Sequence, residues 1–263
     1  MSASGYTAEE LVAAVISREI RDGERAFLGA NMGVGRAAVM LAHLTHAPNL
    51  RVPLGFSWTN LTDAGPLHLH EETTDFRDAR WAEGWMKLDS MIDEYRFFAD
   101  FFVVGALQID RFGNSNLIGL GADHRDLRLR GPGPMGSLSS TAYCDRFYLA
   151  PTRHTAEVFV ERCDFVSNLG WGEGGPEGRS SLSLPGGGPH LCVTPLCVFE
   201  FDAETRALRL RSVHPGTSVE EVLENTGCEV LVGDVVGETE PPGPEELRVL
   251  RTRIHPEREV KAS

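Results

Sequence analysis

Apolar residues occur along the chain both in short runs typical of buried strands and at the spacing typical of helices. The run Phe101–Val104 predicts a buried strand, and residues 191–201 predict a longer one. Residues 208–213 alternate between apolar and polar side chains, which predicts an antiparallel partner across the turn 202–205. Helical spacing marks four further segments, residues 8–22, 36–44, 219–225 and 245–254. Strands and helices that alternate with short connections predict an α/β protein with a largely parallel sheet.

Two glycine-rich turns follow predicted strands and are candidates for ligand binding. The first, residues 29–35, contains Asn31, and its glycine spacing fits neither the Walker loop nor the dinucleotide fingerprint. An acyl or pantetheine group over this turn and a plain tight turn both remain open. The second is residues 131–136, GPGPMG. Glycine turns let backbone N–H groups approach a ligand oxygen, as an acyl thioester needs when charge develops on one oxygen. Strands joined by ordinary turns are the alternative.

Composition and charge narrow the class of protein. At 263 residues the chain is long enough to bury a sizeable core, and its apolar and charged fractions are those of a globular protein. The net charge of −13 argues against a nucleic-acid partner, although a local arginine pocket for a small anion stays open. No apolar run reaches membrane-spanning length and the first residues lack a signal-peptide pattern, so we expect a cytoplasmic protein with no membrane partner.

Cysteine and histidine usage predicts neither disulfides nor a metal site. The five cysteines are odd in number and form no CxxC pair, which predicts buried free thiols. His68, His70 and Glu71 have the chemistry of metal ligands, but they supply at most three ligands on one short segment, with no second cluster. A solvated polar loop is the other interpretation, and no metal is assigned.

Six short motifs, taken together, resemble the β subunit of family I coenzyme A (CoA) transferases over nearly the whole chain. These motifs are residues 105–110 (GALQID), 112–114 (FGN), 131–136, 164–171 (with DFVS and GW), 184–189 (LPGGGP) and 219–227. The resemblance implies the α/β CoA-transferase (NagB-like) fold, an open and mostly parallel sheet flanked by helices, in a single domain over residues 1–263. It also implies a CoA-transferase-like α subunit as partner, in an α2β2 assembly.

One departure from the family bears on mechanism. The family's transferases use a glutamate on the extended segment after the second helix as the nucleophile that attacks the thioester. The resemblance places Gly55 at or next to that position, and residues 47–62 contain no Asp or Glu. The nearest carboxylates, Asp63, Glu71 and Glu72, lie beyond the matched segment. Glycine has no nucleophile, so the ordinary transfer mechanism is in doubt.

This combination is similar to a divergent branch of the family, the ring-opening hydrolases of bacterial steroid degradation. That resemblance implies that water replaces the glutamate and opens a cyclic β-keto acyl-CoA by retro-Claisen carbon–carbon cleavage. The general base is then expected from the partner subunit. The only cofactor-like group expected is the coenzyme A of the substrate itself.

The same resemblance suggests roles for individual residues. The backbone N–H groups of Gly131, Gly133 and Met135 are candidate oxyanion donors, although Pro134 removes one N–H from this loop. Candidate contacts to the acyl or CoA part of the substrate are Asn31, Ser57, Trp58, Thr59, Asn60, Gln108, Asn114 and Arg125. For Gln108 and Asn114 the alternative is turn-stabilising hydrogen bonds, and for Trp58 it is core packing. For Arg125, with Arg128 and Arg130, the alternative is an exposed basic strand.

Two other functions remain open. A true CoA-transferase would take its glutamate from elsewhere, from Glu71 or from the partner. A non-catalytic scaffold would only complete the fold of the partner.

Overall fold

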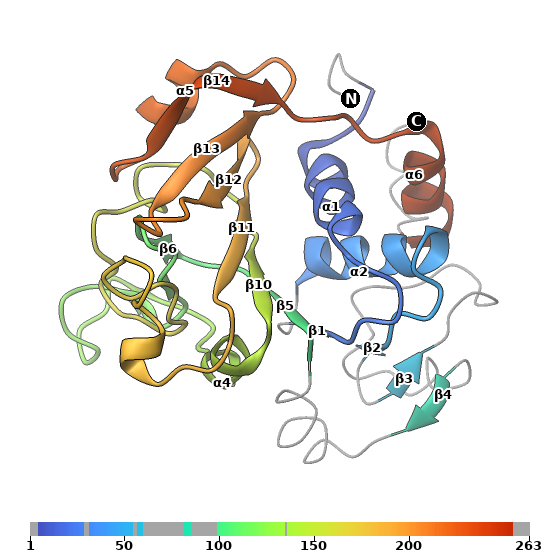
Figure 1. Cartoon of the computed structure of the whole chain (residues 1–263), viewed down its shortest axis with the longest axis horizontal. Coiled ribbons are helices and arrows are strands. Elements are labelled where there is room, and N and C mark those ends of the chain that lie inside the picture. Colours follow the sequence, from blue (N-terminus) through green and yellow to red (C-terminus); the bar gives the residue numbers. More distant parts are fainter. Residues whose placement is uncertain are drawn as a thin grey trace. The chain divides into compact units, whose positions relative to one another are not determined.

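The computed structural model describes residues 5–28, 32–54, 57–59, 82–85, 99–134 and 136–254 (Figure 1). The chain forms two compact units, one of residues 1–101 with 240–263 and one of residues 102–239. The first unit is therefore built from two separate stretches of sequence, and the second from one continuous stretch. That the whole chain is a single domain stays a prediction, because two compact units can belong to one domain.

The first unit is built on two helices, α1 (Ala8–Arg18) and α2 (Gly33–Thr45), which pack against each other. A capping box starts α1: the Thr7 hydroxyl accepts from the Glu10 N–H at 3.2 Å, and the Glu10 carboxylate accepts from the Thr7 N–H at 2.8 Å. Apolar residues at helical spacing, including Leu11 and Ile16, are buried. The helix predicted to reach about residue 22 thus ends earlier, at Arg18.

Short strands and the C-terminal helix complete this unit. Strand β1 (Ala26–Leu28) lies beside β2 (Val52–Leu54), and β2, β3 (Ser57–Thr59) and β4 (Ala82–Trp85) form an antiparallel sheet. Helix α6 (Pro244–Val249) continues into a π-helix, η4 (Leu250–Ile254), and both pack near α2. Two ion pairs tie them to α1, Arg18 with Glu246 at 2.6 Å and Arg251 with Glu10 at 2.7 Å.

The second unit contains most of the central sheet. Its strands lie in the order β5 (Phe101–Val104), β10 (Arg146–Leu149), β11 (Pro189–Val193), β12 (Cys197–Phe201), β13 (Leu208–Val213) and β14 (Leu231–Glu238). The pairs β10/β11 and β13/β14 are parallel, whereas β11/β12 and β12/β13 are antiparallel. The predicted α/β class is confirmed, with a mixed, mostly parallel sheet flanked by helices.

Smaller elements connect these strands. Strand β6 (Gln108–Ile109) pairs with β7 (Ser115–Asn116), and β8 (Gly119–Leu120) pairs with β9 (Leu129–Arg130). Helix α4 (Ser137–Tyr143) precedes β10, a 3₁₀ turn η3 (Ser180–Leu182) lies in the glycine-rich region, and α5 (Val219–Glu224) precedes β14. Ser218 caps α5, since its hydroxyl accepts from the Glu221 N–H at 3.1 Å.

The strand predicted over residues 191–201 is wrong as a single element. The segment is a hairpin of β11 and β12, with a tight turn at residues 194–196. The Thr194 hydroxyl accepts from the N–H groups of Leu196 and Cys197 at 3.1 and 3.0 Å, and Pro195 has no N–H to give to a sheet. The antiparallel pairing of residues 208–213 across the turn 202–205 is confirmed.

The core of the second unit is aromatic and sulfur-rich. Phe147, Tyr148, Phe159 and Phe199 are fully buried, and all five cysteines are free and buried, as predicted. Burial raises the pKa of Cys144, Cys197 and Cys228 to about 12. These thiols therefore stay protonated and unreactive at neutral pH.

No helix in the described ranges is long and apolar enough to cross a membrane.

A buried histidine makes the stability of this unit depend on pH. The two ring nitrogens of His154 lie 2.8 and 2.9 Å from the hydroxyls of Thr194 and Thr226, and its ring packs 4.5 Å from that of Phe159. Burial lowers its pKa to about 4. An unfolded histidine takes up its proton near its ordinary pKa of about 6.5, so the unfolded state binds more protons between these two values. Stability must fall as the pH falls through this window.

We predict that His154 contributes about 2 kcal/mol to the loss of unfolding free energy between pH 7 and pH 5. Urea unfolding at both pH values checks this by comparing the wild type with His154→Gln, which has no group to protonate. The neighbouring buried His214, whose pKa is also lowered, is present in both proteins and cancels in the comparison. Equal pH dependence in the two proteins would contradict the prediction.

Candidate functional site

The turn between β6 and β7 is held by a buried carboxylate. Asp110 accepts three hydrogen bonds, from the N–H of Phe112 at 2.9 Å, from the N–H of Asn114 at 3.1 Å and from the Asn114 amide at 2.8 Å. Burial raises the pKa of this carboxyl, and the hydrogen bonds from Asn114 and Phe112 act against that rise. The Asp110 side chain thus fixes the turn that joins the two strands of this small sheet.

Asn114 extends this turn to the glycine-rich loop that follows residue 169. Its amide donates to the Gly172 carbonyl at 2.7 Å, and its carbonyl accepts from the N–H groups of Gly170 and Gly172 at 2.9 and 3.2 Å. The Asn114 side chain is only 5% exposed. Every hydrogen bond that the structure gives to this side chain stabilises backbone turns, and a contact to a ligand stays a prediction.

Gln108 occupies a similar position in a second part of the network. Its side-chain carbonyl accepts from the Asn116 amide at 2.8 Å and from the Asp164 N–H at 3.0 Å. Asn116 in turn accepts from the Ile118 N–H at 2.8 Å, and the Ser167 hydroxyl accepts from the Leu117 N–H at 2.9 Å. We call the buried residues Gln108, Asn114, Ser115, Asn116, Ser167 and Asn168 the polar cluster. It fixes the backbone of residues 117–118.

The glycine loop, residues 131–136, is attached to that same backbone. The N–H of Gly131 donates to the Ile118 carbonyl at 2.8 Å, and the N–H of Gly133 donates to the Leu117 carbonyl at 2.9 Å. A side chain at Gly131 would overlap the Leu117 carbonyl oxygen, and Gly133 has a φ of +83°, which favours glycine. The two N–H groups predicted as oxyanion donors are therefore already engaged, and each would have to exchange its partner before it could serve a ligand.

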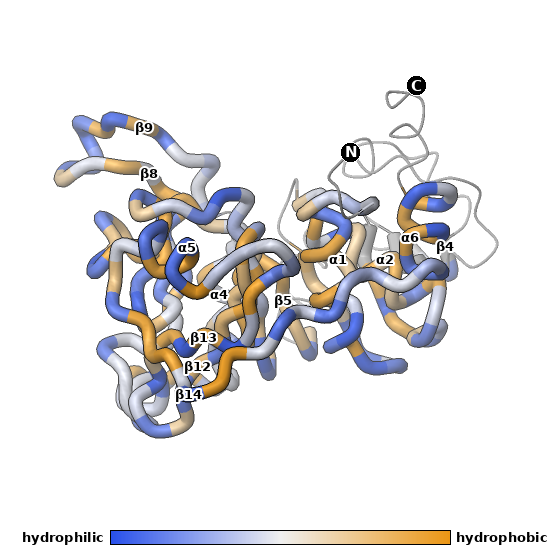
Figure 2. The backbone as a smooth tube through the Cα atoms, turned by 90° about the horizontal axis from the view of Figure 1, so that it is seen from above, coloured by the Kyte–Doolittle hydropathy of each residue, from blue (hydrophilic) through white to orange (hydrophobic). Residues whose placement is uncertain are grey.

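The other predicted contacts are placed differently. Ser57, Trp58 and Thr59 form strand β3, whose backbone is described, whereas Asn31, Gly55, Asn60 and Met135 lie outside the described residues. Arg125 and Arg128 are exposed in the connection between β8 and β9, and Arg130 is exposed in β9 itself. Figure 2 shows this hairpin extending from the rest of the second unit, away from β12–β14. The exposure of Arg125 agrees with the alternative interpretation given for it, an exposed basic segment.

The buried Arg179, which the sequence analysis did not identify, connects the glycine-rich loops of residues 169–188 to α4. The Arg179 guanidinium donates to five carbonyls, those of Gly186 at 2.9 Å, Leu169 at 2.8 Å, Gly170 at 3.0 Å, Thr141 at 2.8 Å and Ala142 at 3.3 Å. Only 3% of Arg179 is exposed, and burial lowers its pKa below the ordinary value. The arginine joins the glycine-rich loops to the end of α4.

Metal binding finds no support in the described residues. Across residues 5–28, 32–54, 57–59, 82–85, 99–134 and 136–254, no group of three His, Cys, Asp or Glu side chains is arranged to hold a metal ion. His68, His70 and Glu71 lie outside these ranges. The absence of a metal site in the whole chain therefore stays a prediction.

Comparison with known proteins identifies the family of the chain. A family model described as coenzyme A transferase matches residues 9–225. The chain therefore belongs to the coenzyme A transferase family.

Within that family the chain is similar to the subunits designated B. It is 30% identical to this subunit of the glutaconate CoA-transferase of Acidaminococcus fermentans, over 96% of this chain and 94% of that protein. It is 33% identical to the cholesterol ring-cleaving hydrolase IpdB subunit of Rhodococcus jostii, over 66% and 67%. The crystal structure of the A. fermentans transferase matches with a TM-score of 0.80 over 97% of both chains, at 29% identity. That of R. jostii IpdAB matches with a TM-score of 0.76 over 96% of both chains, at 27% identity.

We predict that Arg179→Met lowers the free energy of unfolding by at least about 3 kcal/mol, because five carbonyls lose a hydrogen bond from a buried guanidinium. Arg179→Lys is expected to recover only part of this loss, since an ammonium lacks the planar fork that reaches carbonyls on several loops. Urea unfolding measures both. The exposed Arg162→Gln is the matched control, with an expected change within about 0.5 kcal/mol. An Arg179→Met variant as stable as this control would refute the organising role.

Gly131 and Gly133 are constrained for different physical reasons, so alanine at the two positions is expected to have different costs. Gly131→Ala is expected to cost about 3 kcal/mol, because its methyl group meets the Leu117 carbonyl and the Leu107 side chain. Gly133→Ala meets nothing within 4 Å and is expected to cost about 1 kcal/mol, from its positive φ alone. Chemical denaturation ranks the two variants. If Gly133→Ala lowered the free energy of unfolding more than Gly131→Ala does, the loop would not be fixed on residues 117–118.

Proposed function

We propose that this chain is the β subunit of a heteromeric hydrolase that opens the ring of a cyclic β-keto acyl-CoA from steroid rings C and D. One observation carries the proposal: residues 47–62 contain no carboxylate, and the family resemblance puts the position of the catalytic glutamate in this segment, at or next to Gly55. A chain with this departure has no nucleophile for covalent transfer at that position. The similarity to IpdB subunits, named as cholesterol ring-cleaving hydrolase subunits, supports the same interpretation.

In this proposal the chemistry needs a water molecule and a stabilised enolate. Water adds to the ring ketone, the adjacent carbon–carbon bond breaks, and the electron pair moves into the thioester as an enolate, which a proton then quenches. The general base that activates the water is assigned to the partner subunit. Gly131 and Gly133 already donate to backbone carbonyls, so the donor to the enolate oxygen is assigned to Met135 or to the partner.

A CoA-transferase-like α subunit is part of the proposal, in an α2β2 assembly. Support comes from the relatives: the glutaconate and 3-oxoadipate enzymes are named by subunits, and the R. jostii structure is that of IpdAB. A cytoplasmic location belongs to the proposal as well. All five thiols are free and buried, which fits a reducing compartment.

A second candidate is a genuine CoA-transferase that moves CoA between an acyl-CoA and a carboxylic acid. Its support is the 30% identity to the corresponding subunit of the 3-oxoadipate CoA-transferase of Pseudomonas knackmussii, over 94% of this chain and 93% of that protein. In this candidate the attacking glutamate comes from Glu71 or from the partner. The two candidates differ in the bond that breaks. The hydrolase cleaves a ring carbon–carbon bond after water has added to the ketone and leaves the thioester intact, whereas the transferase breaks the thioester and passes CoA to a carboxylic acid.

The test is a reaction in heavy-oxygen water with the chain co-purified with its α subunit. Given a cyclic β-keto acyl-CoA and no acceptor acid, the hydrolase incorporates one heavy oxygen into the new carboxylate of a ring-opened thioester. Mass spectrometry reads the label. No acyl adduct should appear on any carboxylate of either chain after borohydride treatment.

Three results together would contradict the proposal and identify a CoA-transferase. They are no reaction until an acceptor acid is added, exchange of CoA once the acid is present, and a glutamate trapped by borohydride. The assembled complex without the substrate is the control for background labelling.

A further inference from the structure

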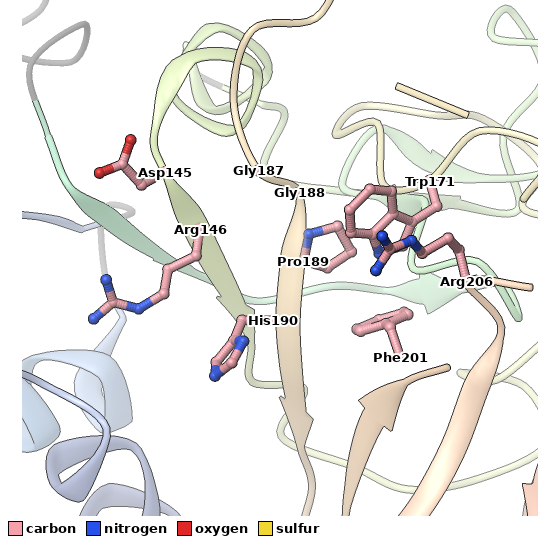
Figure 3. Close-up of a pocket in the computed structure, with 9 residues that line it drawn as sticks. All are labelled: Asp145, Arg146, Trp171, Gly187, Gly188, Pro189, His190, Phe201 and Arg206. Atoms are coloured by element: carbon pink, nitrogen blue, oxygen red, sulfur yellow. The ribbon is translucent and has the colours of Figure 1, made fainter. Parts of the chain in front are cut away.

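A pocket separate from the glycine loop lies at one end of the sheet in the second unit (Figure 3). Its volume is about 380 Å³, and its walls come from the starts of β10 and β11, the end of β12, the glycine-rich loop at Trp171 and the turn before β13. All of these residues belong to the unit 102–239. None of them belongs to residues 131–136 or to the polar cluster.

The pocket has two halves, one on each side of Pro189. Figure 3 shows Arg146, Asp145 and His190 in one half, and Trp171, Arg206 and Phe201 in the other. In the first half Arg146 is held by the Tyr148 hydroxyl, to which it donates at 2.7 Å. The second half offers a guanidinium together with flat apolar walls, and its chemistry is that of an organic anion site.

Arg206 is held in place by its backbone and by a ring. Its φ is +59°, an unusual value for a residue with a side chain, and its N–H donates to the Asp202 carbonyl at 3.0 Å. The guanidinium lies 4.4 Å from the centroid of the Trp171 ring. Trp171 is in turn positioned by Gly188, where an added methyl group would lie 3.0 Å from the ring. The cation is therefore in position before any ligand arrives.

Two N–H donors of this pair lack an acceptor in the part of the chain that the structure describes. They are the Nε of Arg206 and the indole Nε1 of Trp171, and both are buried. Buried donors without a partner are uncommon, and an oxyanion is a strong acceptor for an N–H donor. In addition, the structure gives Arg206 no carboxylate partner among the described residues, although the chain carries a net charge of −13.

We propose that this half-pocket binds an oxyanion carried on a small flat apolar body, with the Arg206 guanidinium on the oxyanion and Phe201 and Pro189 against the body. A carboxylate and a phosphate ester share the required chemistry. The proposal does not depend on the reaction at the glycine loop.

Calorimetric titration of the full-length chain tests the site with benzoate and phenyl phosphate as probes and benzyl alcohol as the neutral analogue. At least one anion is expected to bind saturably below about 10 mM, and the stronger one identifies carboxylate or phosphate as the natural group. Benzyl alcohol is expected not to bind, because it offers the guanidinium no charge. Binding is also expected to weaken as salt is added.

Arg206→Gly removes the guanidinium and at the same time suits the positive φ, so this variant is expected to fold. It should bind the anion at least about tenfold more weakly, which is the loss of a charge-assisted contact. The exposed Arg162→Gln loses the same charge elsewhere and should bind as the wild type does. The proposal is overturned if neither anion binds the wild type, or if Arg206→Gly binds it unchanged. Equal losses in both variants would overturn it too, by showing a general charge effect.

Discussion

The buried Arg179 guanidinium is the interaction on which the loops of the second unit depend. Residues 169–188 contain little regular structure, so their carbonyls cannot find partners in a helix or a sheet ladder. Arg179 supplies donors to five carbonyls from three separate stretches of chain. A neutral side chain would remove these five hydrogen bonds and leave, among the described residues, only the Ala142 carbonyl with another donor, the Gly186 N–H, and a lysine would reach too few of the oxygens. A single charged side chain here replaces the hydrogen bonds that a neighbouring strand supplies elsewhere in the unit.

A second layer of order runs from the sheet to the glycine loop through side chains. Asp110 fixes the turn after β6, Asn116 and Ser167 fix residues 117–118, and the carbonyls of those residues hold Gly131 and Gly133. Each step is a buried or part-buried hydrogen bond, and polar groups of this kind are costly to leave unpaired. The backbone of the glycine loop is thus held by residues that lie some distance away along the chain.

The sequence predicted those parts of the fold that local chemistry determines. The helices that start near residues 8 and 219 and the turn at 202–205 were predicted and are present. Each depends on hydrogen bonds between residues three positions apart, at Thr7, Ser218 and Asp202. The hairpin turn at Thr194 was missed because an apolar run on both sides concealed a single polar residue. Arg179 could not have been found, since its acceptors lie up to 38 residues away in sequence and are backbone atoms. The polar cluster was predicted only in part: Gln108 and Asn114 were identified, with turn-stabilising hydrogen bonds as one of two interpretations, but their partners were not.

The split of the first unit between the two ends of the chain has a consequence for how the protein is made. Residues 102–239 are one continuous stretch, so the second unit has all of its residues outside the ribosome well before synthesis ends. Helix α1 emerges first, yet its partners Glu246 and Arg251 are the last described part of the chain to be translated. Helix α1 can pack against α2 as soon as both are translated, but its ion pairs with Glu246 and Arg251 must wait for more than two hundred further residues. The segment translated first is therefore the last to receive all of its charged partners.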